Sequence, residues 1–228
     1  MTSAGKIGLL LATIAITVAI YLFGDFKGKG KEKEETPAET TSAEFDYNLY
    51  KQTQLQSLEP VERQKLEALE KDLDKAASNE EKIAVLNQLI AECEKQKLEL
   101  IATMYSKEIA KLKEEAEIWD VTGTYFMGLY YNMPEAPEIQ QFELEEARQC
   151  FVKATELDTA NLEYKVRLGV TFMEDQTQTM QGVQILLGVV EKDSNHVSAN
   201  LYLGRFGIIS GQYDKAINRL NTRNPVIN

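Results

Sequence analysis

Few residues of this 228-residue chain have side chains that could perform catalysis or bind a metal. It has one histidine, His196, and two cysteines, Cys93 and Cys150, and these lie far apart in the sequence. A zinc site needs such ligands in closely spaced pairs, so this set cannot form one with ordinary spacing. His196 stands between two predicted helices, and a helix boundary explains it. We therefore expect no metal and no cofactor.

The chain also lacks the loops and nucleophile motifs of common enzyme classes. Residues 28–31, Gly-Lys-Gly-Lys, have neither the spacing of a phosphate-binding loop nor a preceding strand. The nucleophile motif Gly-x-Ser-x-Gly does not occur. Each cysteine lies among apolar neighbours on a predicted helix, which favours a buried free thiol. A disulfide stays open, because sequence cannot place one. The expectation is a protein that is not an enzyme.

The charge distribution argues against nucleic acid as a partner. The chain carries 25 basic and 36 acidic residues, a net charge of −11 at pH 7. All of this excess lies after residue 35, because residues 1–35 hold five lysines and four acids. Binding to a phosphate backbone requires clustered Lys and Arg, and such an acidic chain would be repelled.

An uncharged apolar run extends from Ile7 to Phe23. Its 17 residues reach the lower limit for a helix that spans a hydrocarbon core about 30 Å thick. Tyr21 and Phe23 would then lie at the interface, where aromatic side chains are enriched. The alternative is a cleaved signal peptide, but no small-residue cleavage site follows Phe23. We predict a transmembrane anchor over residues 1–23, followed by a flexible linker over 24–44 that has no apolar face.

The orientation of this anchor is ambiguous. One lysine precedes the apolar run and four follow it, which favours a cytoplasmic side for the remainder of the chain. The four alternate with acids, however, and a short head with one lysine is also typical of an anchor whose N-terminus stays inside. Our prediction is a single-pass bacterial protein of the inner (cytoplasmic) membrane with its soluble part on the extracytoplasmic side.

From Phe45 onward, apolar residues recur at helical spacing, and no useful alternating strand pattern occurs. Pro60 suits the first turn of a helix. Ser78 followed by Glu81 is typical of a capping box, in which side chains and backbone N–H groups of the first turn bind each other. These signals predict helical hairpins over 45–115, with helices at 46–57, 60–76, 79–95 and 97–114.

Three glycines mark a repeating pattern after residue 116. Gly123, Gly169 and Gly204 have similar surroundings and are separated by 46 and 35 residues. After each comes a set of small and large apolar residues, at 147, 151 and 154, at 182, 186 and 189, and at 216 and 220. The segment between the glycine and its apolar set is twelve residues longer in the first repeat, and one residue longer in the second, than in the third. When these extra residues are subtracted from the two glycine separations, both become 34 residues. A constant 15 residues separates one set from the next glycine.

A 34-residue helical hairpin with these positions resembles the tetratricopeptide repeat. The segment from Gly211 to Ile217, GQYDKAI, is similar to the family's GxYxxAI turn, and Leu157-Asp158 and Lys192-Asp193 are similar to its turn between repeats. The resemblance covers residues 119–224. It implies three repeats within 116–228, a degenerate fourth at 79–114, and an all-α solenoid whose stacked hairpins bury each other's apolar faces.

In this family the first helices line a concave face that commonly binds peptides. By its position in the repeats, the resemblance implies six candidate partner-binding residues: Asp120, Thr124, Glu163, Arg167, Tyr202 and Arg205. Val166, Val170 and Leu201 are expected on the same face. The Lys and Asn of a clamp for a C-terminal carboxylate are absent. Arg167 and Arg205 could still each bind a carboxylate with the planar guanidinium. The alternative is that all of these residues are solvated helix faces.

Two further surfaces could carry function. The segment 127–146, which is about twelve residues longer than in the other repeats, contains Pro134 and Pro137 and is predicted as a long loop that binds a partner or caps the core. At the C-terminus, Arg223 stands where a small residue is expected, and Pro225 ends the last helix. No capping helix follows, which leaves three alternatives open: a truncated chain, an edge that meets a partner or a second copy of the chain, or a native short end.

The anchor, linker and repeats together predict a membrane-anchored scaffold or adaptor for protein–protein interaction, in envelope biogenesis, secretion or the chaperoning of exported chains. The alternative is a structural component that self-assembles through the C-terminal edge. The expected partners are another protein or peptide in the groove and the membrane through residues 7–23. A homo-oligomer stays open.

Overall fold

The computed structural model describes residues 45–132 and 136–221, and all regular structure within them is helical. The predicted anchor and linker, Pro134 and residues 222–228 lie outside the described residues. What the sequence indicates about them therefore stays a prediction. Within the described ranges no helix is long and apolar enough to cross a bilayer. The helices are α2 (Tyr47–Ser57), α3 (Pro60–Lys75), α4 (Asn79–Lys95), α5 (Glu99–Lys113), α6 (Ala116–Asn132), α7 (Pro137–Leu157), α8 (Leu162–Glu174), α9 (Thr179–Lys192), α10 (Val197–Ile209) and α11 (Tyr213–Asn221).

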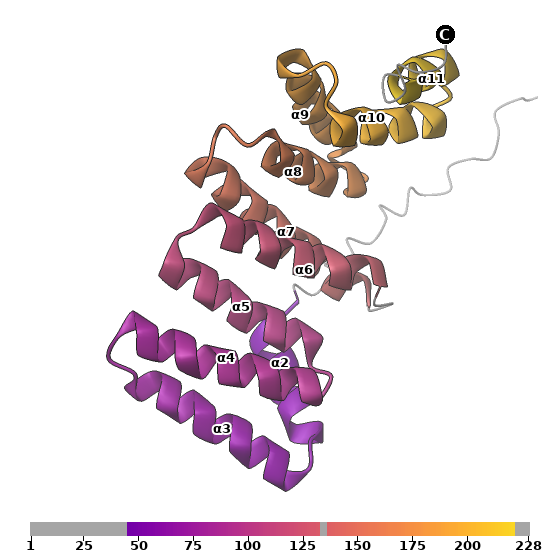
Figure 1. Ribbon diagram of the computed structural model, residues 1–228. Coiled ribbons are helices and arrows are strands. Elements are labelled where there is room, and N and C mark those ends of the chain that lie inside the picture. Colours follow the sequence, from indigo (N-terminus) through magenta and orange to yellow (C-terminus); the bar gives the residue numbers. More distant parts are fainter. Residues whose placement is uncertain (1–44, 133–135, 222–228) are drawn as a thin grey trace, which may run out of the picture. The chain divides into compact units, whose positions relative to one another are not determined.

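Neighbouring helices pair into hairpins, and the hairpins stack into a solenoid. The pairs α4/α5, α6/α7, α8/α9 and α10/α11 pack closely, and α5/α6, α7/α8 and α9/α10 join one pair to the next. Figure 1 shows this order along the stack, from α3 at one end to α11 at the other. The predicted all-α hairpin architecture is confirmed for the described residues.

Local signals explain where the first helices begin. Asp46 caps α2, since its carboxylate accepts hydrogen bonds from the backbone N–H groups of Asn48 and Leu49. Pro60 is the first residue of α3. Ser78 and Glu81 form both hydrogen bonds of the predicted capping box at the start of α4. The predicted and observed ends of the four helices from α2 to α5 differ by at most two residues.

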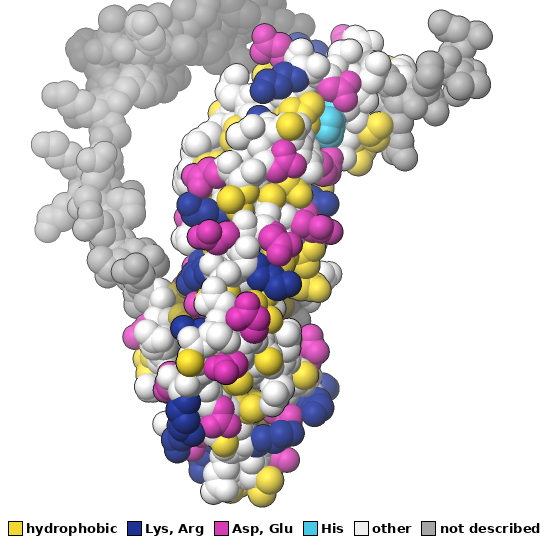
Figure 2. Space-filling view, turned by 60° about the vertical axis from the view of Figure 1, so that its left-hand side comes forward, with side chains coloured by type: hydrophobic (Ala, Val, Ile, Leu, Met, Phe, Trp, Pro, Cys, Tyr) yellow, Lys and Arg dark blue, Asp and Glu magenta, His cyan; other side chains and the backbone are white. Residues whose placement is uncertain are grey.

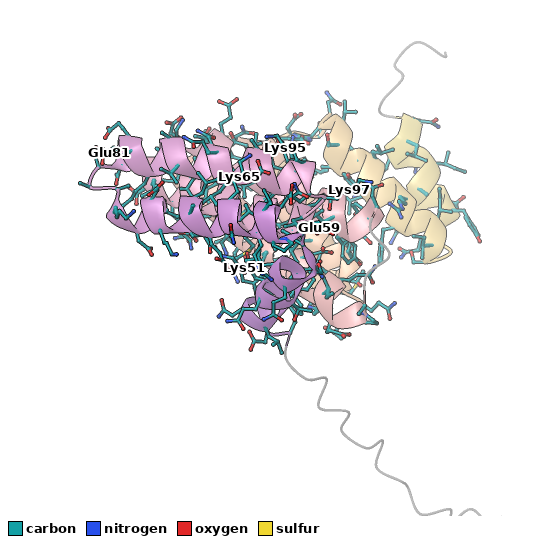
Figure 3. The ribbon with its side chains drawn as sticks, turned by 90° about the horizontal axis from the view of Figure 1, so that it is seen from below. Lys51, Glu59, Lys65, Glu81, Lys95 and Lys97 are labelled. Carbon is teal, nitrogen blue, oxygen red and sulfur yellow. The ribbon has the colours of Figure 1, made fainter. Side chains whose placement is uncertain are left out.

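Side-chain contacts tie α2 to the N-terminal end of the stack, which Figure 3 shows from below. Lys51 of α2 forms an ion pair of 2.5 Å with Glu70 of α3, and its ammonium lies 5.0 Å from the ring centroid of Tyr105. The Tyr105 hydroxyl donates to Glu70 at 2.7 Å. On the same end, hydrogen bonds from Lys65, and then from Lys95, lower the pKa of the buried Glu92 carboxyl against the opposing effect of burial. These contacts join α2, α3, α4 and α5.

The predicted glycine register is confirmed. A Cβ atom added to Gly123 would lie 2.8 Å from the Phe151 ring, and one added to Gly204 would lie 2.9 Å from Leu220. In the middle hairpin the corresponding distance, from Gly169 to Leu186, is 3.1 Å. Each first helix therefore lacks a side chain where a large residue of the second helix packs. The close approach of the two helices in each hairpin depends on this.

The tightest of these approaches is at Gly182, and it leads to a stability prediction. A Cβ atom there would lie 2.3 Å from the carbonyl oxygen of Gly169 and 2.7 Å from the backbone nitrogen of Met173. We expect Gly182→Ala to lower the free energy of unfolding by about 1–3 kcal/mol, because backbone atoms must move apart. Urea unfolding followed by circular dichroism measures this change.

Gly188 of the same helix provides the matched control. A Cβ atom there would meet nothing within 4 Å. Gly188→Ala should therefore show only the gain in helix propensity, up to about 1 kcal/mol of stabilisation. A Gly182→Ala variant as stable as Gly188→Ala would contradict the packing described here.

The predicted long loop at 127–146 is wrong. The extra residues lengthen both helices instead, so that α6 has 17 residues and α7 has 21, against 13 in α8 and 14 in α9. Pro137 starts α7 rather than breaking it. The added turns bury Leu144, and the ring of Phe142 packs 4.9 Å from that of Phe45 and 5.9 Å from that of Tyr47. Burial of this apolar face favours helix over loop.

Candidate functional site

Three of the six predicted groove residues meet on the first helices. Arg167 of α8 donates through Nη1 to Asp120 Oδ2 at 2.7 Å and to Thr124 Oγ1 at 2.8 Å, both on α6. The expectation that this guanidinium would be available for a partner's carboxylate needs correction. It is already bound to a carboxylate of its own chain, and the pair ties α6 to α8.

The environment of this pair is only partly solvated. Asp120 is 7% exposed, and its Oδ1 has no hydrogen-bond partner among the described residues. Burial raises the pKa of the Asp120 carboxyl, and the charge of Arg167 opposes that rise. The Arg167 side chain is 37% exposed. Such a pair suits a structural tie between hairpins.

The other three predicted residues lie in different surroundings. Glu163 faces the start of α10, where its Oε2 lies 3.8 Å from Nε2 of His196, and the His196 ring caps that helix. Tyr202 and Arg205 line a small hollow of about 190 Å³ between α8 and α10. Arg167 does not line this hollow. The predicted residues therefore lie in three places rather than in one continuous site.

The residues predicted beside these six divide between core and surface. Val166 is fully buried, so its assignment to the concave surface is wrong. Val170 is 6% exposed and forms part of the wall of the small hollow. Leu201 is exposed at 43%. The sequence predicted which residues share a helix face, but it could not predict which of them a neighbouring hairpin would bury.

A larger hollow lies between α4, α5 and α6, and Thr124 is the one predicted residue among those that line it. We call it the α4–α6 groove, and its volume is about 630 Å³. Its apolar lining includes Ile90, Ile109, Val121 and Tyr125. Its charged lining consists of carboxylates alone, and no Lys or Arg contributes. The full lining is Asn87, Ile90, Glu94, Glu99, Ala102, Thr103, Ser106, Ile109, Glu117, Ile118, Val121, Thr122, Thr124, Tyr125, Gly128 and Leu129.

A signal for this groove was present in the sequence. Glu117, Val121 and Tyr125 are spaced by four residues and so share one face of α6. Val121 is 42% and Tyr125 56% exposed, which is unusual for a stripe of large side chains. The repeat pattern begins at residue 119, and α4 and α5 correspond only to its degenerate fourth hairpin. It therefore gave no partner for this stripe.

Another hollow, of about 690 Å³, lies between α5, α6 and α7, with Lys107, Lys111, Arg148 and Lys153 in its lining. Each of these cations is already paired within the chain: Lys107 with Glu146, Lys111 with Glu108, Arg148 with Glu145 and Asp175, and Lys153 with Glu156. Neutralised in this way, they do not make an anion site. The smaller α4–α6 groove is the better candidate.

Neither cysteine offers a reactive site. Cys93 and Cys150 are both free and both fully buried. Burial raises the pKa of each thiol to about 12. Within residues 45–132 and 136–221, no group of three His, Cys, Asp or Glu side chains is placed to hold a metal ion.

These pKa values predict the outcome of thiol labelling. Near pH 8 only about one thiol in ten thousand would be ionised, and the thiolate is the species that reacts. We expect iodoacetamide to modify neither cysteine in the folded protein and both in guanidinium. Mass spectrometry of the intact chain counts the added groups. Rapid labelling of the folded protein at either position would show that the helices open there.

Comparisons with known proteins give a likeness in helical arrangement only. No protein-family profile matches the chain, and no curated protein sequence matches it. A crystal structure of MamA is similar with 15% identity, covering 78% of this chain and 92% of that one, with a TM-score of 0.46. MamA 41-end from Desulfovibrio magneticus RS-1 has 14% identity, 76% and 90% coverage and a TM-score of 0.46. For MamA MSR-1 C2 the values are 15%, 68% and 91%, and 0.43. Values this low say nothing of function, and the fold assignment rests on the chain's own helices.

Proposed function

We propose that this protein is a scaffold that binds another protein through the exposed face of its stacked helices. The observation that carries the proposal is the α4–α6 groove. There, the exposed side chains of Val121 and Tyr125 lie in one hollow with the half-buried Ile90 and Ile109, so the apolar surface is gathered in a single groove formed by three helices. Exposed aromatic side chains on a rigid surface are typical of protein interfaces. No reaction chemistry accompanies them.

Site-specific crosslinking tests this function. A photoreactive amino acid replaces Tyr125 in the groove, or Lys153 on α7 as a control. Lys153 is also exposed but lies outside the groove. After irradiation of cells that produce the full chain, mass spectrometry identifies the attached proteins. We expect a partner that attaches at position 125 and not at 153. Equal recovery of the same proteins at both positions, or of none at 125, would remove the basis for the scaffold.

We further propose that residues 7–23 anchor the protein in the inner membrane and that the helical stack is extracytoplasmic. The support is the uncharged apolar run and the linker behind it. A topology fusion placed after residue 44, with a reporter active only outside the cytoplasm, tests both parts. An inactive reporter in a membrane-bound fusion would place the helical stack on the cytoplasmic side. A partner in secretion or envelope assembly would then have to be cytoplasmic as well.

Self-assembly is the second candidate function, and the last hairpin favours it. Leu201 is 43% exposed, whereas Val166, at the same position of the preceding hairpin, is fully buried. Ile217 is 55% exposed, whereas its counterpart Val183 is 7% exposed. In the hairpin formed by α8 and α9, both helices are covered by α10, the first helix of the following hairpin. A second copy could cover this face, and light scattering over micromolar concentrations would exclude it by showing a strict monomer.

A further inference from the structure

The α4–α6 groove has a negative charge that no ion pair of residues 45–132 and 136–221 neutralises. Glu94 comes from the last turn of α4, Glu99 from the start of α5 and Glu117 from the start of α6, and all three line the groove. Within the described residues none of them has an ion-pair partner, and no Lys or Arg lines the groove. On the face seen in Figure 2, acidic and basic side chains are mixed. A concave surface of one sign attracts the opposite charge.

The same groove presents apolar side chains between these carboxylates. Val121 and Tyr125 are 42% and 56% exposed, and Ile90 and Ile109 are half-buried at the α4 and α5 walls. At Gly128 a Cβ atom would meet nothing within 4 Å, so space remains beside Tyr125 along α6. A partner must therefore bring apolar side chains as well as positive charge.

The dimensions of the groove indicate the kind of partner. Its lining on α6 extends from Glu117 to Leu129, a span of twelve helical rises and therefore about 18 Å along the helix. About five residues of extended chain, or about three turns of helix, cover that distance. The exposed side chains of Glu94 and Tyr125 show that the groove lies along the surface instead of being enclosed, which suits a peptide segment better than a small molecule.

From these observations we propose that the α4–α6 groove binds a segment of a partner protein that carries Lys or Arg next to large apolar residues. The cations meet Glu94, Glu99 and Glu117, and the apolar side chains pack on Val121 and Tyr125. This inference rests on the proposed function and specifies the partner's chemistry. A C-terminal carboxylate is the wrong ligand here, because it would face three carboxylates.

A random peptide library gives the test, with no partner known in advance. Phage that display roughly twelve-residue peptides are selected on the immobilised full-length chain in detergent. We expect the selected sequences to be enriched in Lys or Arg beside Leu, Ile or aromatic residues. Fluorescence anisotropy with a labelled synthetic copy then gives the dissociation constant, which should increase with salt.

Matched variants show where the selected peptide binds. Glu94→Gln with Glu117→Gln should weaken binding about fivefold, and Tyr125→Ala about tenfold or more. Asp74→Asn with Glu191→Gln makes the same charge change outside the groove, and Tyr213→Ala removes a tyrosine exposed at 63%. These controls should leave the dissociation constant within about twofold of the parent value. Circular dichroism checks that every variant is folded.

Three outcomes would overturn the inference: selected sequences without Lys or Arg, a selection that yields no binder, or binding that the groove variants do not change. Peptides that lose affinity with Tyr202→Ala but not with Tyr125→Ala would place the interaction in the small hollow. That result would reject the inference, but it would not by itself decide whether the protein is a scaffold. The proposed scaffold function is tested separately, by the crosslinking experiment at position 125.

Discussion

Replacing Phe151 with alanine is expected to lower the free energy of unfolding by about 3–5 kcal/mol. Phe151 of α7 is 1% exposed and packs against the backbone of α6 at Gly123. Its removal leaves a cavity at the contact that holds the first repeat hairpin together. Neighbouring helices cannot fill the cavity without giving up their own contacts. Urea unfolding measures the change, and Tyr213→Ala, at an exposed tyrosine, serves as the control.

Gly123 makes this prediction more specific. Alone, Gly123→Ala should destabilise the protein, because the new methyl group would lie 2.8 Å from the Phe151 ring. Combined with Phe151→Ala, the same methyl group should be tolerated, since the ring is gone. The two changes should therefore couple by about 1 kcal/mol or more in a double-mutant cycle. Strictly additive effects would mean that the two residues do not touch.

The second large effect is expected at the buried ion pair of Lys107 and Glu146. Lys107 of α5 is 7% exposed and Glu146 of α7 is 8% exposed, and Lys107 also donates to Gln149 Oε1 at 3.0 Å. Glu146→Ala leaves the ammonium buried with only a neutral acceptor. We expect a loss of about 3 kcal/mol, because an uncompensated buried charge is costly. Thermal and urea unfolding both report it.

Two comparisons separate this effect from a general loss of charge. Glu156→Ala breaks the exposed pair with Lys153, which spans 2.7 Å, and should cost about 0.5 kcal/mol or less. Replacing both partners, as Lys107→Met with Glu146→Leu, should restore most of the stability. If the double replacement were as unstable as Glu146→Ala, packing rather than charge would be the cause.

Much of the fold could be predicted from local features of the chain. Ser78, Glu81 and Pro60 determine helix starts through hydrogen bonds and backbone geometry that need no distant partner. The spacing of Gly123, Gly169 and Gly204 from the apolar sets that follow predicted which residues pack within each hairpin. That prediction succeeded because the two helices of a hairpin are close in sequence, and their register follows from helical periodicity.

The candidate site was predicted only in part. The sequence placed Asp120, Thr124 and Arg167 on the same concave face, but it did not show that they would bind each other. Residues 137–146 became helix because Phe142 meets Phe45 and Tyr47, which lie almost one hundred residues earlier in the chain. No local pattern contains such a contact.

The sequence by itself therefore determined the helices, the hairpin register and the lack of obvious catalytic groups. Only the tertiary structure decided which exposed faces stay open. Glu94, Glu99 and Glu117 belong to three different helices, and they become one surface only when α4, α5 and α6 pack together. The physical reason is the distance along the chain over which each kind of interaction acts. Caps and periodicity act over one or two turns, whereas the α4–α6 groove depends on the angles and distances at which separate helices pack.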